Sequence, residues 1–413
     1  MIDQLPERRA LPDDVRLRAR RRLSEGMRPS ARAGRPALIA AGVGVLAAGA
    51  VFAGQALLGS PADPAAPPVQ HNGEFVGKDR AVVNNVDKGP LGPDMMARCV
   101  AAATSHPPAE QWTTIAVSHK NGTVLSAFRG PTGVFFCANT ATTTAISAPD
   151  PAGAGTGRRQ VRILFTTPTG AMAGLVSPDV KHLSLSRTVD PGWNNASPAV
   201  VDGMFLAPSG YAGAETGTTA LVDGEESVLE GVPGPTAPVT DLPAPPADRS
   251  TPEAQRLAEC LRDRAVPDAD QFSHGVTAKV SGTSTVVVGR FGDLMFYCLD
   301  DGAKRHGLVD NLRDKDDVEL VYGQTIGSVR VAYDFKPIEG GGTASSDYAA
   351  VGLLFDPEVA SITYTSPGSA DVPAVIGNGT FVLAAPFDEA RPGAQVVVRN
   401  AAGLVLETIT PAR

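Results

Sequence analysis

The chain carries the stretch RGPTGVFFC at residues 129–137 and a related stretch, RFGDLMFYC, at residues 290–298. Each stretch begins with an arginine and ends on a cysteine that follows two aromatic residues. Each of these cysteines lies 38 positions after another cysteine, so the pairs are Cys99 with Cys137 and Cys260 with Cys298. Further likenesses keep the same order along the chain: Val161-Arg162 and Val329-Arg330, Gly174-Leu175 and Gly352-Leu353, Pro178-Asp179-Val180 and Pro357-Glu358-Val359, and Gly203 with Phe205 and Gly379 with Phe381. Two diverged copies of one fold explain these likenesses.

Each copy is predicted to begin with one helix and to continue as strands. In the second copy Thr251 suits a helix N-cap, Pro252 suits the first helical position, and residues 257–264 keep helical spacing. In the first copy Asn121-Gly122 separates two β-rich runs, which predicts a hairpin with a tight turn. We therefore expect a mainly β (α+β) protein, a tandem repeat of a helix packed on an antiparallel β-sheet or sandwich. The mixed-charge residues 304–317 are predicted to be an exposed loop.

Proline and glycine mark the domain boundaries. Gly 44 and Pro 35 make up almost a fifth of the 413 residues, above the usual share of roughly 12%. Seven prolines fall between positions 233 and 252, and this density predicts a linker without strands or helices. The predicted organisation is a cytoplasmic tail at 1–36, a transmembrane helix at 37–58, an extracytoplasmic stalk at 59–90, a first repeat at 91–230, a Pro-rich linker at 231–251 and a second repeat at 252–413.

Residues 37–58 form an uncharged apolar run of 22 residues. As a helix this run would span about 33 Å, which matches a hydrocarbon core of ~30 Å. Arginines precede the run, whereas residues 59–74 contain neither lysine nor arginine, so the N-terminus is predicted to be cytoplasmic and the repeats extracytoplasmic. A cleaved signal peptide is the alternative, although the run exceeds the usual h-region of ~7–15 residues.

The first 36 residues carry ten arginines and five acidic residues, a net charge of +5, so the remaining residues sum to −13 out of the total of −8. An acidic body argues against nucleic-acid binding, which needs a positive surface. The tail resembles the short Arg-rich leaders of single-pass membrane proteins from high-GC Gram-positive bacteria. It lacks the His and paired Cys of a zinc anti-sigma domain, so the resemblance implies a membrane location. The tail either sets the topology or engages anionic lipid or a cytoplasmic partner.

The four cysteines are predicted to be structural. An exported region favours disulfides, and repeat symmetry selects Cys99–Cys137 and Cys260–Cys298 among the three connectivities. The alternative, a four-cysteine zinc site, lacks the close paired spacing of zinc ribbons.

No catalytic motif is apparent in the sequence. The six histidines show no metal-ligand spacing, and neither a phosphate-binding loop nor a nucleophile elbow occurs. We therefore expect no catalytic residue, no cofactor and no metal. Repeated arginines are the candidate ligand contacts, because a guanidinium can grip a carboxylate or phosphate with two hydrogen bonds. These candidates are Arg129 with Arg290 and Arg162 with Arg330.

Three functions remain open from the sequence. The leading hypothesis is a non-enzymatic, single-pass envelope protein whose two modules bind, sense or scaffold a cell-wall or protein partner. The second is a signalling protein whose basic tail engages a cytoplasmic regulator. The third is an envelope hydrolase or transferase with an unrecognised site.

Overall fold

The computed structural model describes the two repeats and the linker between them, and these residues belong to one compact unit of the chain. The described ranges are 82–83, 85–87, 89–151, 160–180, 183–187, 196–209, 218–222, 225–229, 232–262, 264–300, 305–312, 319–334, 336–337, 343–344, 347–387 and 392–411. The predicted cytoplasmic tail, the predicted transmembrane helix and most of the predicted stalk lie outside them. Within these ranges no helix has the length and apolar character that a membrane crossing requires.

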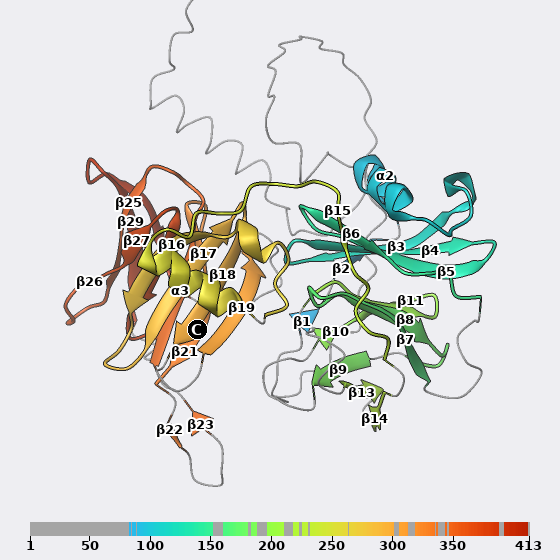
Figure 1. The fold of residues 1–413 in the computed structure, drawn as a ribbon. Helices are drawn as coiled ribbons and strands as arrows, with labels where there is room; N and C mark the ends of the chain where they lie inside the picture. Colours follow the sequence, from blue (N-terminus) through green and yellow to red (C-terminus); the bar gives the residue numbers. More distant parts are fainter. Residues whose placement is uncertain are drawn as a thin grey trace, which may run out of the picture. The chain divides into compact units, whose positions relative to one another are not determined.

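The first repeat consists of a helix and three sheets stacked as four layers (Figure 1). Helix α2 (Pro93–Ala102) covers a helix-side sheet, which is followed by a middle sheet and an outer sheet. The helix-side sheet has the order β15 (Val239–Thr240), β6 (Thr143–Ile146), β5 (Gly133–Asn139), β4 (Thr123–Gly130), β3 (Thr113–Lys120) and β2 (Asn85–Asp87). The middle sheet has the order β11 (Ala199–Val201), β12 (Met204–Ala207), β8 (Met172–Val176) and β7 (Val161–Thr166), and the outer sheet β1 (Val82–Val83), β10 (Ala196–Ser197), β9 (Leu183–Arg187), β13 (Thr218–Val222) and β14 (Glu225–Val228). A short 3-10 helix, η1 (Ala109–Gln111), precedes β3.

The second repeat has the same four layers. Helix α3 (Pro252–Leu261) and the 3-10 helix η3 (Ala269–Gln271) precede a helix-side sheet of β16 (Ser273–Lys279), β17 (Thr285–Phe291), β18 (Leu294–Asp300) and β19 (Arg305–Asn311). The middle sheet contains β20 (Glu319–Tyr322), β21 (Ile326–Tyr333), β24 (Asp347–Leu354), β28 (Thr380–Ala384) and β27 (Val375–Gly377). The outer sheet contains β26 (Val372–Pro373), β25 (Val359–Thr365), β29 (Gln395–Asn400) and β30 (Val405–Ile409), and a two-stranded sheet pairs β22 (Lys336–Pro337) with β23 (Thr343–Ala344).

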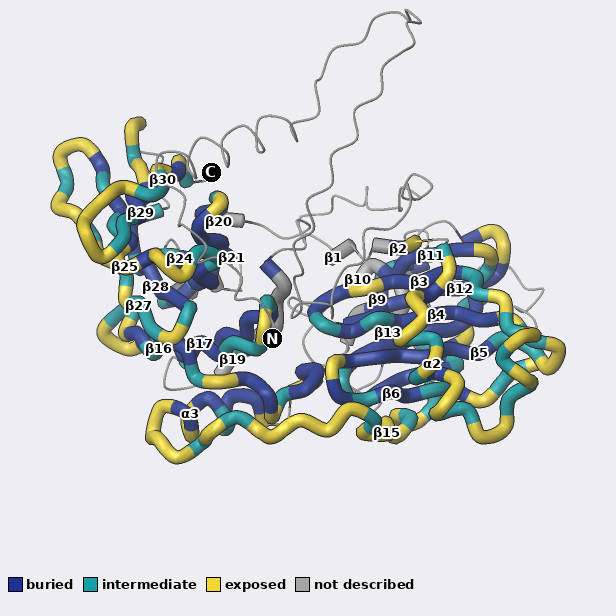
Figure 2. Tube along the Cα trace, turned by 90° about the horizontal axis from the view of Figure 1, so that it is seen from above, coloured by how far each residue is buried: buried dark blue, intermediate teal, exposed yellow. Residues whose placement is uncertain are grey.

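Alternating side chains explain why the sheets stack. Successive residues of a strand point to opposite faces, so a strand with both faces covered is apolar along its whole length. In β5, Phe135 packs toward α2 whereas Phe136 packs toward the middle sheet, and both are fully buried. Phe296 and Tyr297 divide in the same way in β18. Figure 2 shows the strands of both repeats as largely buried, with exposure concentrated in the turns.

The predicted mainly β fold, the repeat and the local signals are confirmed. Asn121 and Gly122 both have positive φ, at 47° and 81°, as the tight hairpin turn requires. Helix α3 begins at Pro252, and the Thr251 side chain accepts a hydrogen bond from the amide of Ala254. The third sheet of each repeat was not part of the prediction.

Two local expectations are wrong. Residues 304–317 were predicted to be a loop, yet β19 takes residues 305–311 as the fourth strand of its sheet. Main-chain pairing with β18 fixes this strand, so its mixed charges do not prevent it from forming. The Pro-rich segment was expected to hold no strand, yet β15 pairs with β6. An edge strand tolerates neighbouring prolines because only one of its sides must donate hydrogen bonds.

The Pro-rich segment bonds to both repeats. The amides of Thr236, Asp241 and Leu242 donate to carbonyls of the first repeat, and the amide of Ala247 donates to the carbonyl of Asp270. Asp268 of the second repeat, which is 8% exposed, accepts hydrogen bonds from residues 140–142, the turn between β5 and β6. The linker is therefore held along its length.

Candidate functional site

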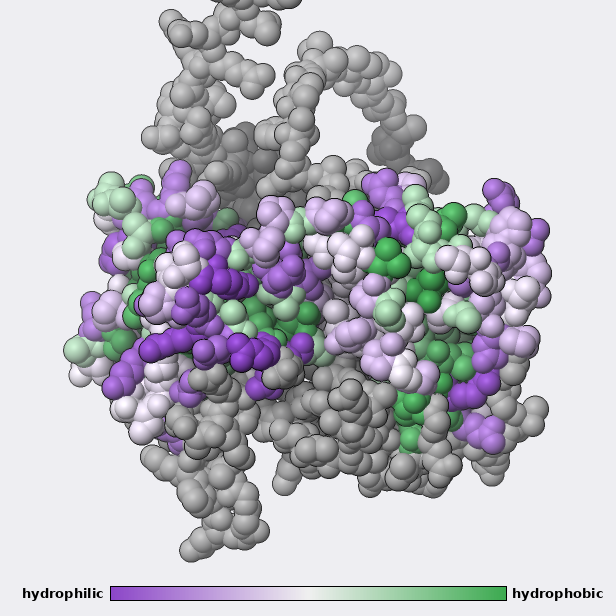
Figure 3. Space-filling view, in the orientation of Figure 1, coloured by the Kyte–Doolittle hydropathy of each residue, from purple (hydrophilic) through white to green (hydrophobic). Residues whose placement is uncertain are grey.

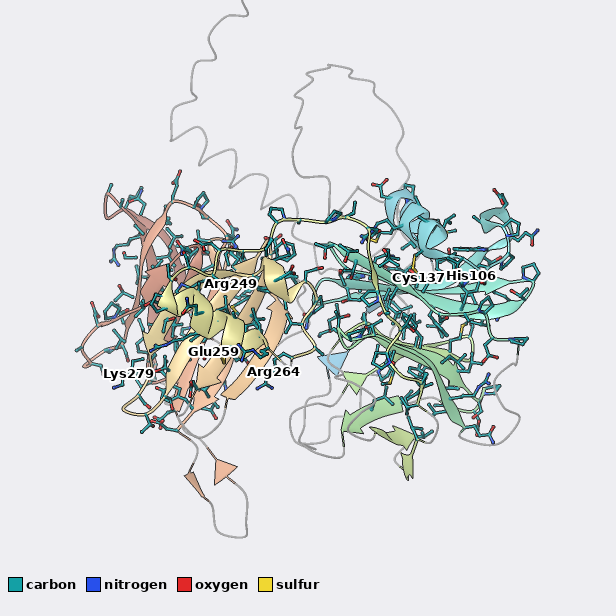
Figure 4. All side chains as sticks on the ribbon, in the orientation of Figure 1. His106, Cys137, Arg249, Glu259, Arg264 and Lys279 are labelled. Atoms are coloured by element: carbon teal, nitrogen blue, oxygen red, sulfur yellow. A yellow bond between two sulfur atoms is a disulfide. The ribbon has the colours of Figure 1, made fainter. Side chains whose placement is uncertain are left out.

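The two disulfides hold equivalent places in the two repeats. Cys99 bonds Cys137 and Cys260 bonds Cys298, so each bond ties the opening helix to the third strand of the helix-side sheet. Figure 4 shows Cys137 beneath α2. Both disulfides lie in buried clusters, which makes them structural cross-links of the two folds.

Arg290 closes the second repeat at the end of β17. Its Nε donates to the carbonyl of Gly292 at 2.8 Å, and its Nη1 lies 3.4 Å from the carbonyl oxygen of Leu354 and 3.2 Å from that of Gly379. The guanidinium therefore joins the helix-side sheet to the middle sheet. This arginine is a structural tie rather than a free ligand contact.

Arg129 holds the same place in the first repeat but does not make the same bonds. It pairs with Val134 across β4 and β5 as Arg290 pairs with Met295 across β17 and β18. Its side chain is exposed, and within the described ranges its guanidinium has no hydrogen-bond partner. A groove of about 490 Å³ opens beside it. We call this hollow the Arg129 groove.

The adjoining turn explains the difference between the two arginines. The two-residue turn after Arg290 is Gly292-Asp293, and Gly292 has a φ of +60°, which presents its carbonyl to the Nε of Arg290. The corresponding turn in the first repeat is Pro131-Thr132. Proline is fixed near φ −65° and cannot adopt that conformation. Arg129 therefore lacks the acceptor that draws its counterpart inward.

Three walls of the Arg129 groove are also smaller than their counterparts, whereas Met204 is larger than its counterpart, Thr380. Seven of its eleven lining residues are apolar side chains: Val134, Leu175, Val176, Pro178, Val180, Val200 and Met204. Strand register and matching hydrogen bonds pair three of these with larger residues of the second repeat, namely Val134 with Met295, Val176 with Leu354 and Val200 with Ile376. Each of these three exchanges removes side-chain volume beside an arginine that stays outside.

The remaining lining residues form the polar rim. Apart from Arg129 they are Ser177, Asp202 and Gly203. The Ser177 hydroxyl accepts a hydrogen bond from the amide of Gln160. Asp202 is exposed, and its counterpart Asn378 instead donates to the carbonyl of His274. The rim of this groove thus carries one cationic and one anionic side chain.

The other predicted arginines do not line this groove, although Arg162 pairs with the lining residue Leu175. Arg162 forms an exposed ion pair with Asp150 at 3.2 Å, and Arg330 lies over the ring of Tyr348 with its Cζ 5.2 Å from the centroid. The prediction that they are equivalent is wrong. Arg162 pairs with Leu175 and Gly327 pairs with Leu353, so Gly327 is the counterpart of Arg162. Sequence matching placed β7 three residues out of register, because it rested on a two-residue match, Val161-Arg162 with Val329-Arg330, that lies at a different register in the paired strands.

A second hollow, of about 520 Å³, lies beside α3 and is polar. Its lining includes Arg256, Glu259, Thr285 and Asp300, and Figure 3 shows hydrophilic residues gathered over this helix. Figure 4 places Glu259 on α3. In the first repeat the position of Arg256 is taken by Met95, which packs against the buried cluster under α2. The charges of this hollow are mixed and point to no single ligand.

The groove walls were missed by the sequence analysis, although the repeat alignment contained the signal, namely smaller residues at three matched positions. In the part of the chain that the structure describes, no three His, Cys, Asp or Glu side chains gather closely enough to hold a metal ion. No protein-family model matches the chain, and no curated protein is significantly similar to it in sequence.

Proposed function

We propose that this chain is a non-enzymatic envelope protein whose first repeat binds a ligand in the Arg129 groove, and whose second repeat is a sealed copy of the same module. The observation that carries this proposal is the contrast between the two arginines. Arg290 makes three main-chain contacts across its repeat, whereas Arg129, at the same position, stands beside an open groove.

The composition of the groove supports binding rather than catalysis. Ligand sites in proteins are largely apolar hollows of ~300–1,000 Å³ with a few polar groups that fix orientation. The eleven lining residues include no His, Cys, Lys, Glu or Tyr. Ser177 therefore has no His, Lys or Glu beside it in the groove to act as a general base, and its hydroxyl already accepts a hydrogen bond from the amide of Gln160.

The disulfides and the apolar run support the proposed location. Two disulfides suit an oxidising compartment. Residues 37–58 would then hold the chain in the cell membrane with the N-terminus cytoplasmic and both repeats outside. Signalling through the tail and envelope hydrolysis are the alternatives, and no contact in the described ranges favours either of them.

The test uses the full-length protein in its own membrane and a short alkyl probe that carries a photoreactive diazirine. After irradiation, labelled peptides are mapped by mass spectrometry. We expect labelling to concentrate on peptides that contain residues 172–180 and 199–205, since both segments line the groove. The triple variant Val134→Met, Val176→Leu, Val200→Ile should lose most of this labelling, because it installs the larger walls of the second repeat.

The control is a measurement that the triple variant still folds. Its near-ultraviolet circular dichroism and its two disulfides should remain unchanged, since each substitution restores a residue that the other repeat already accommodates. Equal labelling of the wild type and a folded triple variant would refute a ligand site in this groove.

A further inference from the structure

We propose that the ligand of the Arg129 groove is a small aliphatic molecule with one carboxylate, in which the chain lies against the apolar walls and the carboxylate binds Arg129. This inference rests on the proposed function and names the ligand class. It uses three features of the groove: an available guanidinium, mostly apolar walls and a single acidic residue on the rim.

The guanidinium supplies the anion contact. Arginine carries donors in a planar fork that matches both oxygens of a carboxylate, and such charge-assisted pairs are the stronger hydrogen bonds. The guanidinium of Arg290 donates hydrogen bonds to main-chain carbonyls, whereas no described residue accepts a hydrogen bond from the guanidinium of Arg129. An incoming carboxylate would therefore displace only water.

The walls favour an alkyl chain over a peptide. Val176, Val180 and Met204 are at most 5% exposed. Val176 and Val180 belong to the core between the middle and outer sheets, and Met204 belongs to the core between the helix-side and middle sheets, so the floor of the groove is formed by core residues. A peptide would bring an amide N–H and a carbonyl every few ångströms, and each buried amide group without a partner costs free energy. Ser177 is the one uncharged polar side chain in the lining. An alkyl chain has no polar groups that need hydrogen-bond partners.

The rim favours a single negative charge. Asp202 shares the rim with Arg129, and a second anionic charge on the ligand head would be repelled by its carboxylate. A carboxylate carries one charge, whereas a phosphate monoester approaches two at neutral pH. A cationic head would meet Arg129 itself. The rim thus favours a monoanion at Arg129 over a dianion.

The experiment repeats the photolabelling on full-length protein with three probes that share one eight-carbon diazirine chain and end in a carboxylate, an alcohol or a phosphate. We expect the carboxylate probe to label the groove peptides about tenfold more than either of the others at equal concentration. Arg129→Gln should abolish this preference, and Arg129→Lys should keep part of it, since lysine retains the charge but not the fork.

Arg162→Gln is the matched control, because it removes one exposed arginine from the same repeat outside the groove, and it should leave the preference intact. Equal labelling by the alcohol and carboxylate probes, or stronger labelling by the phosphate probe, would overturn the ligand class while leaving the proposed function in place. Failure of all three probes to label the groove would overturn both.

Discussion

The two repeats share four layers and one disulfide each, yet they are stabilised in different ways. In the first repeat, α2 is held by its disulfide and by Arg98, which bonds Asp241 and the carbonyls of Thr140 and Thr143. In the second repeat the counterpart of Arg98 is Glu259, and it lines an open polar hollow. The open apolar groove lies in the first repeat, whereas Arg290 seals its counterpart in the second. Duplication thus allowed each copy to open a different surface.

The largest expected effect concerns the disulfides. Removing either one, by Cys99→Ala with Cys137→Ala or by Cys260→Ala with Cys298→Ala, should lower the free energy of unfolding by about 4 kcal/mol, the chain-entropy value for a loop of this size. The consequence for the helix should differ between repeats. Hydrogen exchange should show α3 losing its protection without Cys260–Cys298, whereas α2 keeps part of its own through Arg98. Equal loss in both helices would refute the proposed role of Arg98.

A smaller loss is expected at Asp268. This buried carboxylate accepts hydrogen bonds from Thr140, Ala141 and Thr142, and its counterpart in the first repeat is Pro108, so only the second repeat provides this contact. Asp268→Ala should cost about 3 kcal/mol, because donors are left without an acceptor. The measurements are chemical denaturation and hydrogen exchange of residues 139–144.

Asp268→Asn is the informative control. Asp268 has a φ of +50°, which asparagine tolerates better than alanine does. The asparagine variant keeps the backbone conformation and one acceptor oxygen, so its loss should be roughly half that of the alanine variant. An equal loss in both variants would show that the negative charge, rather than the number of acceptors, stabilises the turn.

The next smaller effect is expected from a pair of variants, Arg290→Ala in the second repeat and Pro131→Gly in the first. Arg290→Ala should open a groove in the second repeat at a cost of about 2 kcal/mol, since charge-assisted bonds to Gly292, Leu354 and Gly379 are lost. The alkyl probes should then also label peptides containing residues 353–359 and 375–381. Pro131→Gly should do the opposite in the first repeat, because glycine permits the turn that draws the arginine inward.

The two halves of this exchange test different causes. If Arg290→Ala creates new labelling but Pro131→Gly leaves the first groove unchanged, wall size rather than turn geometry keeps that groove open. If neither variant changes the labelling, the arginines do not control access to either groove.

The sequence was sufficient for features that depend on local spacing. The Asn121-Gly122 turn and the Thr251-Pro252 helix start are each set within a few residues, and both are present. The cysteine pairing followed instead from the repeat, which places the partners 38 positions apart in both copies, and both disulfides are present. The aromatic residues Phe135, Phe272 and Phe296 are fully buried, as a protein with few aromatics requires. Mainly β character follows from the same signals.

The remaining features depend on distant partners. Strand β19 forms because β18 provides its main-chain hydrogen-bond partners, and the mixed-charge sequence of β19 does not reveal this pairing. The register of β7 is set by its pairing with β8, which shifts between Ile163 and Phe165, and a two-residue sequence match does not reveal that pairing. The Arg129 groove arises where three shortened walls from three strands meet, and only the fold brings them together.

The smallest effect concerns the linker strand and its dependence on pH. Burial alone would raise the pKa of Asp241, but the hydrogen bonds from Arg98 and Thr144 outweigh burial and lower this pKa below its ordinary value of 3.8. A lowered folded-state pKa stabilises the protein at pH values above 3.8, and this stabilisation is lost as pH falls through the lowered value.

Asp241→Asn should therefore cost about 1 kcal/mol at pH 6, because the ion pair is partly exposed, and the difference from wild type should vanish in strong acid. Denaturation of both proteins across the acid range measures this difference. Asp248→Asn is the control, since the pKa of Asp248 is also lowered, by hydrogen bonds from Ser250, yet these bonds come from a residue only two positions away and not from the first repeat. An Asp241 effect that persists unchanged in strong acid would show that packing of the linker, rather than the carboxylate's charge, holds β15 against β6.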